Sequence, residues 1–133
     1  MRRLALIALV AGVVLAFGGI AGARTPSSAT KIVLDHSSHQ SGGNINLNDF
    51  VGHLKSRTKR CLAGRTVKVL LHNGNDGSTK LLDADRTDED GVWAVGGNTI
   101  QADLARFVVT RKRIGGRHHR HVCKADSTSV HFA

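Results

Sequence analysis

Three histidines lie close together in the segment Arg117-His118-His119-Arg120-His121. On a β-strand, His119 and His121 project from the same face, where two imidazoles can bind one Zn²⁺ or Cu²⁺. The neighbouring arginines oppose a cation, and the spacing matches no zinc-finger or metalloenzyme motif. We therefore interpret the segment as a solvated basic loop and keep divalent-metal binding through residues 118–121 as the alternative. A third ligand would come from elsewhere in the chain, such as His53, His72 or His131.

Basic residues gather in two stretches of the chain, Lys55–Arg65 and Arg111–Arg120. Strand alternation would place Lys55, Arg57 and Lys59 on one face. Such a face predicts salt-sensitive contact with an anionic polymer, for example teichoic acid, acidic polysaccharide, lipid head groups or extracellular DNA. The alternative is that the charges serve solubility alone. The predicted polyanion-binding residues are Lys55, Arg57, Lys59, Arg111, Lys112, Arg113, Arg117 and Arg120.

Other ligand classes have weaker support. Residues Asp83–Gly91 carry four aspartates and a glutamate, but their spacing does not fit an EF-hand, so we expect a turn with an acidic rim. The chain has no tyrosine and one tryptophan, and no groove-reading motif is visible, which argues against sequence-specific nucleic-acid recognition. No nucleophile elbow, zincin motif or phosphate-binding loop occurs, so we expect no catalytic residues and no obligatory cofactor.

The N-terminus has the pattern of a signal peptide. Arg2 and Arg3 precede an unbroken apolar run from Leu4 to Phe17, and Ala21-Gly22-Ala23 offers small residues for a signal peptidase. We expect cleavage after Ala23; the alternative, a retained anchor, is disfavoured because the apolar run is shorter than the ~20 residues a bilayer requires. The remaining 110 residues carry 17 Lys and Arg against 10 Asp and Glu, a net charge of +7. The expected location is outside the cell or in the cell wall.

An exported chain meets an oxidising compartment, so its two cysteines, Cys61 and Cys123, are expected to form a disulfide. Closing a loop of this length stabilises a small domain by about 4 kcal/mol in the chain-entropy account. The alternative is a pair of buried free thiols.

From Asn44 onward the chain shows short apolar alternations separated by Gly, Asn and Asp, with no sustained helical period. Residues 24–44 are rich in Ser, Thr and Gly, and we predict a flexible leader there. Residues 45–133 are predicted to form one all-β domain, an antiparallel β-sandwich of about seven strands. A helical turn at 101–107 is the one competing possibility. The predicted strands are 45–54, 66–72, 80–84, 92–95, 106–114, 122–123 and 129–132, with turns at 73–77 and 87–91.

Within these strands, Val67, Val69 and Leu71 are expected to point one way, and Trp93 is expected to anchor the core. Gly91 is expected to supply the positive φ of the turn that it ends.

Three segments carry a resemblance to a known group of proteins: Cys61–Val69, Thr87–Trp93 and Cys123–Ser127. Their order resembles exported bacterial β-sandwich modules related to carboxypeptidase regulatory-like and prealbumin-like domains, common in high-GC Gram-positive bacteria. In those modules a Cys-x-x-Gly-Arg opens a core strand and a late cysteine closes the fold. This chain departs from them in lacking a tyrosine-rich strand before the last cysteine. The resemblance implies a sandwich and no catalytic residues.

Overall fold

The structure is a computed structural model that describes residues 24–42, 45–99 and 102–132. The predicted signal peptide, residues 1–23, therefore lies outside the described residues. Within them the regular secondary structure is almost entirely β, as predicted. Its elements are β1 Ser27–Ser28, β2 Lys31–Gly42, β3 Ile45–Lys55, the 3-10 helix η1 Lys59–Cys61, β4 Thr66–His72, β5 Thr79–Arg86, β6 Val92–Thr99, β7 Leu104–Val109, β8 Lys112–Ile114, β9 His121–Cys123 and β10 Asp126–His131. None of the helices in these ranges is long and apolar enough to cross a membrane.

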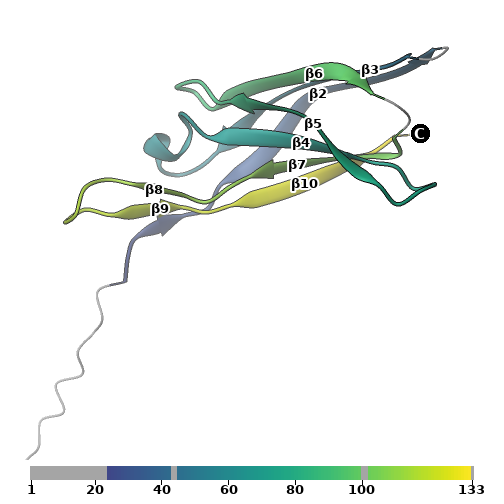
Figure 1. Ribbon diagram of the computed structural model, residues 1–133. Coiled ribbons are helices and arrows are strands. Elements are labelled where there is room, and N and C mark those ends of the chain that lie inside the picture. Colours follow the sequence, from purple (N-terminus) through teal and green to yellow (C-terminus); the bar gives the residue numbers. More distant parts are fainter. Residues whose placement is uncertain (1–23, 43–44, 100–101, 133) are drawn as a thin grey trace, which may run out of the picture.

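Two antiparallel sheets form the body of the sandwich (Figure 1). One has the strand order β10-β7-β4-β5 and the other the order β2-β3-β6. A third, small sheet of β1, β9 and β8 extends from one end, where β8 and β9 form a hairpin and β1 runs parallel to β9. The described part of the chain thus has ten strands where the sequence predicted about seven, because short strands and an additional N-terminal strand were not anticipated.

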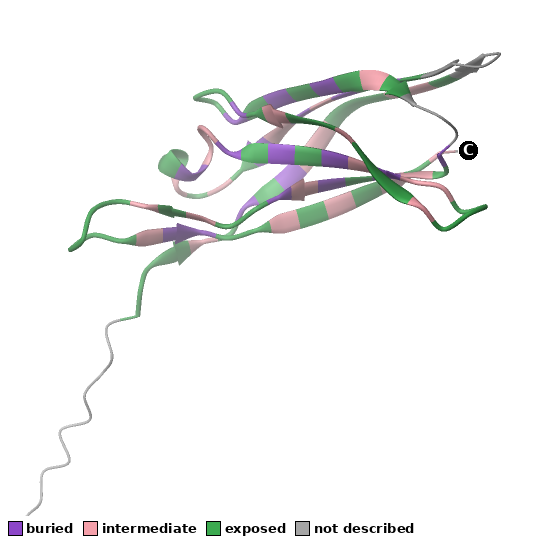
Figure 2. Cartoon of the chain, in the orientation of Figure 1, coloured by how far each residue is buried: buried purple, intermediate pink, exposed green. Residues whose placement is uncertain are grey.

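The core lies between the two large sheets. In β4, Val67, Val69 and Leu71 are buried and alternate with less buried residues, as predicted, and Figure 2 shows this alternation along the strands. Aromatic rings connect the sheets: Phe107 of β7 meets Phe50 of β3 edge-on, with ring centroids 5.1 Å apart. Trp93 of β6 is buried and lies 5.5 Å from the Phe107 ring, which confirms its predicted place in the core.

Two aspartates hold the sheets together at their edges. Asp85 of β5 accepts a hydrogen bond from the backbone N–H of Ala94 in β6, at 2.9 Å. On the opposite edge, Asp126 of β10 accepts one from the backbone N–H of Ile32 in β2, at 2.8 Å. Each carboxylate satisfies a backbone donor that would otherwise be unpaired at a sheet edge, so the sandwich is closed on both sides.

Two predictions about secondary structure are wrong. The flexible leader predicted over 24–44 is instead ordered over most of its length, because Lys31–Gly42 forms β2 and pairs with β3. The helical turn given as a competing possibility for 101–107 does not occur in the described part of that segment, since Leu104–Val109 is strand β7. Finally, the strand predicted over 106–114 is broken between β7 and β8. Although some apolar residues here fall at helical spacing, strand pairing with β4 and β10 decides the conformation of β7.

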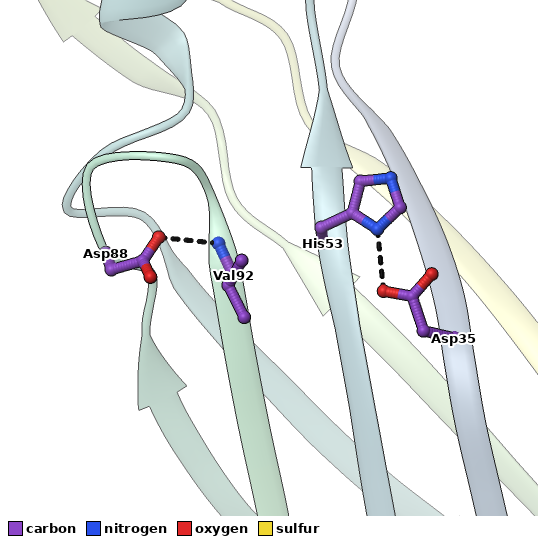
Figure 3. A network of polar contacts seen from close by, with 4 residues as sticks. All are labelled: Asp35, His53, Asp88 and Val92. Atoms are coloured by element: carbon purple, nitrogen blue, oxygen red, sulfur yellow. Dashed lines mark hydrogen bonds and ion pairs between the residues drawn. The ribbon is translucent and has the colours of Figure 1, made fainter.

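The two predicted turns are present. In the first, Asn73 accepts a hydrogen bond from the backbone N–H of Gly77, and hydrogen bonds from Ser78 hold the pKa of Asp76 below its ordinary value. In the second, Asp88 Oδ1 accepts bonds from the backbone N–H groups of Asp90 and Val92, the latter drawn in Figure 3. Gly91 has φ +86°, as expected. The acidic segment therefore uses a carboxylate to build its turn.

Gly52 of β3 permits the closest packing inside the β2-β3-β6 sheet. A Cβ at this position would lie 2.4 Å from the carbonyl oxygen of Val33 and 2.5 Å from the Trp93 ring. Neither the β2 backbone nor a fully buried indole can move away cheaply, so only glycine fits. The indole therefore occupies the space of the missing side chain.

The Gly52→Ala substitution should lower the free energy of unfolding by about 3 kcal/mol, since it forces apart a strand and a buried ring. Thermal or urea unfolding of the purified domain measures this. Gly116→Ala is the control, because nothing lies within 4 Å of a Cβ there and its stability should stay within about 0.5 kcal/mol of the parent. Equal stabilities for the two variants would contradict the packing described here.

Candidate anion-binding surface

The predicted disulfide brings the two basic stretches together. Cys61 ends η1 and Cys123 ends β9; both are buried, with a Cα–Cα distance of 5.4 Å. Figure 1 shows η1 and the β8–β9 hairpin at the same end of the sandwich, opposite the C-terminus. We call this region the basic end and define it as residues Lys55–Cys61 together with Arg111–Lys124. The cysteines are 62 positions apart in the sequence, so the disulfide brings two distant segments together in one surface.

A buried arginine connects the same segments. Arg65 is 1% exposed, and its guanidinium donates four hydrogen bonds. The acceptors are Thr30 Oγ1 at 3.1 Å, the Cys61 carbonyl at 2.9 Å, the Thr110 carbonyl at 2.7 Å and the Lys124 carbonyl at 3.1 Å. Burial lowers the pKa of the guanidinium from its ordinary value, although an arginine remains charged at neutral pH.

Arg65 ends the first basic stretch of the sequence but does not belong to the exposed basic surface. The residue does not face solvent and is unavailable to a polymer. Strand alternation could have predicted the burial of Arg65. Residue 65 precedes the buried Val67 by two positions, so both side chains lie on the core face. A charged side chain on the core face of a strand is stable only when its donors are satisfied, which here is done by backbone carbonyls.

Lys112 has a partly structural role as well. Its side chain is half-buried, and Nζ donates to the carbonyl oxygens of Ala63 at 3.2 Å and Gly64 at 3.5 Å. It therefore ties β8 to the loop between η1 and β4. Of the eight predicted polyanion-binding residues, Lys112 is the one least free to meet a partner.

The other seven predicted cations are exposed, but not in the predicted arrangement. Lys55 ends β3, Arg57 lies in the following link and Lys59 begins η1, so the prediction that they share one strand face is wrong. The chain turns after Lys55 because η1 must bring Cys61 to the disulfide. The exposed cations of the basic end that were predicted are Lys55, Arg57, Lys59, Arg111, Arg113, Arg117 and Arg120.

The β8–β9 hairpin projects beyond the two large sheets, and its tip is exposed (Figures 1 and 2). Residues 111–124 include six Lys or Arg and three His, with no Asp or Glu. A projecting hairpin with charges of one sign raises the local positive potential and presents it to solvent on several sides.

In the described residues, these cations form no side-chain ion pair with a carboxylate. In residues 24–42, 45–99 and 102–132, the one side-chain ion pair within 4.0 Å is His53–Asp35, at 2.7 Å, across β2 and β3 (Figure 3). The acidic loop Asp88–Asp90 borders the basic end, since Leu54 N–H bonds to the Gly91 carbonyl. It limits the positive surface on one side, and no carboxylate of that loop pairs with a lysine or arginine in the ranges above.

The histidines of the hairpin are separated. His119 lies in the loop, whereas His121 begins β9 and its Nε2 lies 2.9 Å from Ser28 Oγ, with Thr58 Oγ1 at 3.4 Å. No group of three or more His, Cys, Asp or Glu placed to hold a metal ion occurs in the described part of the chain. Metal binding through residues 118–121 stays a prediction that no observation favours.

The contact between Ser28, Thr58 and His121 was not predicted from the sequence. Ser28 and Thr58 also bond to each other, so three segments meet: β1, the link before η1, and β9. A serine hydroxyl bonded to an imidazole resembles the nucleophile and base of a catalytic triad. In a triad, a third group orients the imidazole. Among the hydrogen bonds of the described residues, none is made by His121 Nδ1, and the contact fastens β1 to the basic end.

No protein-family profile, curated protein or solved structure matches the chain. The resemblance to carboxypeptidase regulatory-like and prealbumin-like modules therefore stays an expectation from the sequence. The exposure and charge of the basic end are therefore the observations that bear on function.

Replacing Arg65 tests whether it holds the basic end together. Arg65→Leu should lower the free energy of unfolding by about 3 kcal/mol or more, because three carbonyls and a hydroxyl lose their donor inside the protein. Arg65→Lys should lie between the parent and Arg65→Leu, since an ammonium cannot reproduce the planar fork. Urea unfolding with the disulfide intact provides the measurement.

Arg106→Leu removes an exposed arginine from β7 and serves as the control, with an expected change within about 0.5 kcal/mol. An Arg65→Leu variant as stable as this control would show that the buried network contributes nothing.

Proposed function

We propose that the chain is a secreted, non-catalytic β-sandwich module that associates with anionic cell-envelope or extracellular polymers through its basic end. The observation that supports this most directly is a set of seven exposed cations, held in one region by a disulfide and lacking any carboxylate partner in the described residues. A polymer of phosphate, sulfate or carboxylate groups supplies the missing counter-charges.

The binding would be electrostatic and spread over several contacts. Each lysine or arginine that meets a phosphate releases condensed counterions, so affinity falls steeply as salt rises. The guanidiniums of Arg113, Arg117 and Arg120 on the projecting hairpin can form bidentate contacts to phosphate or carboxylate. The Asp88–Asp90 loop repels an anionic chain on one side and thereby directs it across η1 and the hairpin.

The test compares two variants with the same net charge. In the first, Arg113, Arg117 and Arg120 are changed to Gln; in the second, Lys68, Lys80 and Arg106, which are exposed on the β10-β7-β4-β5 sheet, are changed to Gln. Binding to inorganic polyphosphate is measured by fluorescence anisotropy over a series of salt concentrations. The hairpin variant should bind at least tenfold more weakly, and its salt slope should fall by about 2.

The sheet variant should keep the affinity of the parent to within about threefold, since it changes only the long-range field. Equal losses in both variants would mean that net charge alone drives binding, and the basic end would have no special role. Binding that does not respond to salt would also reject the proposal.

A further inference from the structure

A shallow groove of about 500 Å³ lies next to the basic end. The start of β2, the end of β3 and the residue after η1 form its walls, and its lining surface is mostly apolar. The apolar lining residues are the exposed Ala29, the half-buried Leu62 and Leu54, which is only 2% exposed. The complete lining is Ala29, Lys31, Leu54, Lys55, Ser56, Arg57 and Leu62.

Three of these residues are cations, and none is an acid. Lys31 and Lys55 are direct partners across the β2–β3 ladder, so their side chains leave the sheet on the same face. Like charges in directly opposed positions destabilise a strand pair unless an anion lies between them. Arg57 adds a third exposed cation, and none of the three is paired with a carboxylate in the residues that the structure describes.

We propose that this groove binds an anionic phospholipid at a bilayer surface. The phosphate lies among Lys31, Lys55 and Arg57, and the upper part of one acyl chain lies against Leu62 and Ala29, next to the buried Leu54. The inference rests on the proposed function and names a partner for one part of the same surface. An apolar floor beside three cations matches an amphiphile, whereas a soluble polyanion would leave that floor exposed to water.

The path of the chain supports a lipid partner. Residues Arg24–Ser28 lead into the domain along β9, where the Pro26 and Ser28 carbonyls accept hydrogen bonds from Val122 and Lys124. Arg24, where the described chain begins, is thus followed directly by the strand that pairs with β9 of the basic end. The predicted signal peptide ends at Ala23, so during the proposed export the basic end would be the part of the domain nearest to the lipid surface.

The test uses a carboxylate placed in the groove. Ala29 is exposed and lines the groove, so Ala29→Glu fills it with an anion that pairs with the lysines and takes the place of the phosphate. Asn75→Glu makes the same charge change in an exposed turn between β4 and β5 and is the matched control. Circular dichroism with thermal unfolding establishes that both variants remain folded.

Two probes are used with each protein. Octyl phosphate and ethyl phosphate are titrated by calorimetry, and octyl phosphate should bind the parent more tightly, by up to about fourfold for each added methylene that is buried. Vesicles of phosphatidylcholine with and without phosphatidylglycerol are then used in flotation assays. Ala29→Glu should weaken binding to the phosphatidylglycerol vesicles by about fivefold or more, and Asn75→Glu by less than twofold.

Equal affinity for octyl and ethyl phosphate, or equal losses in the two variants, would overturn the lipid inference. Polyphosphate binding that still depends on the hairpin arginines would then leave the proposed function standing. Conversely, chain-length-dependent binding that Ala29→Glu removes, without any polyphosphate binding, would support the groove and reject the polymer.

Discussion

The arrangement of this domain depends on one buried cation. The guanidinium of Arg65 reaches Cys61 at the end of η1 and three residues that lie in separate connections between strands, Thr30, Thr110 and Lys124. An arginine without a carboxylate partner is costly to bury, and three backbone carbonyls with one hydroxyl offset that cost because connecting segments have carbonyls free to accept. The same guanidinium satisfies the hydrogen-bonding capacity of those carbonyls. It thereby links the segments at this end of the sandwich to one another.

The disulfide and Arg65 act on the same segments by different means. The covalent bond restricts the unfolded chain, whereas the hydrogen bonds fix the directions in which the connections leave Cys61 and Cys123. With Lys112 bonded to the loop at Ala63 and Gly64, β8 is held against that loop as well. The exposed arginines of the hairpin are therefore presented from a fixed base, and this reduces the ordering cost when a multivalent partner binds.

The sequence allowed the class of fold to be predicted, because alternation and turn residues are local signals. Val67, Val69 and Leu71 and the turn ending at Gly91 are examples. It did not show β2, since Lys31–Gly42 alternates weakly and becomes a strand through its ladder with β3. The basic residues were identified, but their geometry was not: Lys55, Arg57 and Lys59 diverge because the chain must reach the disulfide, a long-range constraint that spacing alone does not contain.

Acidic and basic side chains have different partners in this molecule, and this difference leaves the surface with unpaired positive charge. Asp35 pairs with His53, and six other aspartates, at positions 76, 83, 85, 88, 103 and 126, accept hydrogen bonds from backbone N–H groups. Among the lysines and arginines of the described residues, only Arg65 and Lys112 donate side-chain hydrogen bonds. Turns and sheet edges need acceptors for orphan N–H groups, so acidic side chains are engaged by the fold. Apart from Arg65 and Lys112, the cations of the described residues have no comparable role, and their positive charge remains available to a partner outside the domain.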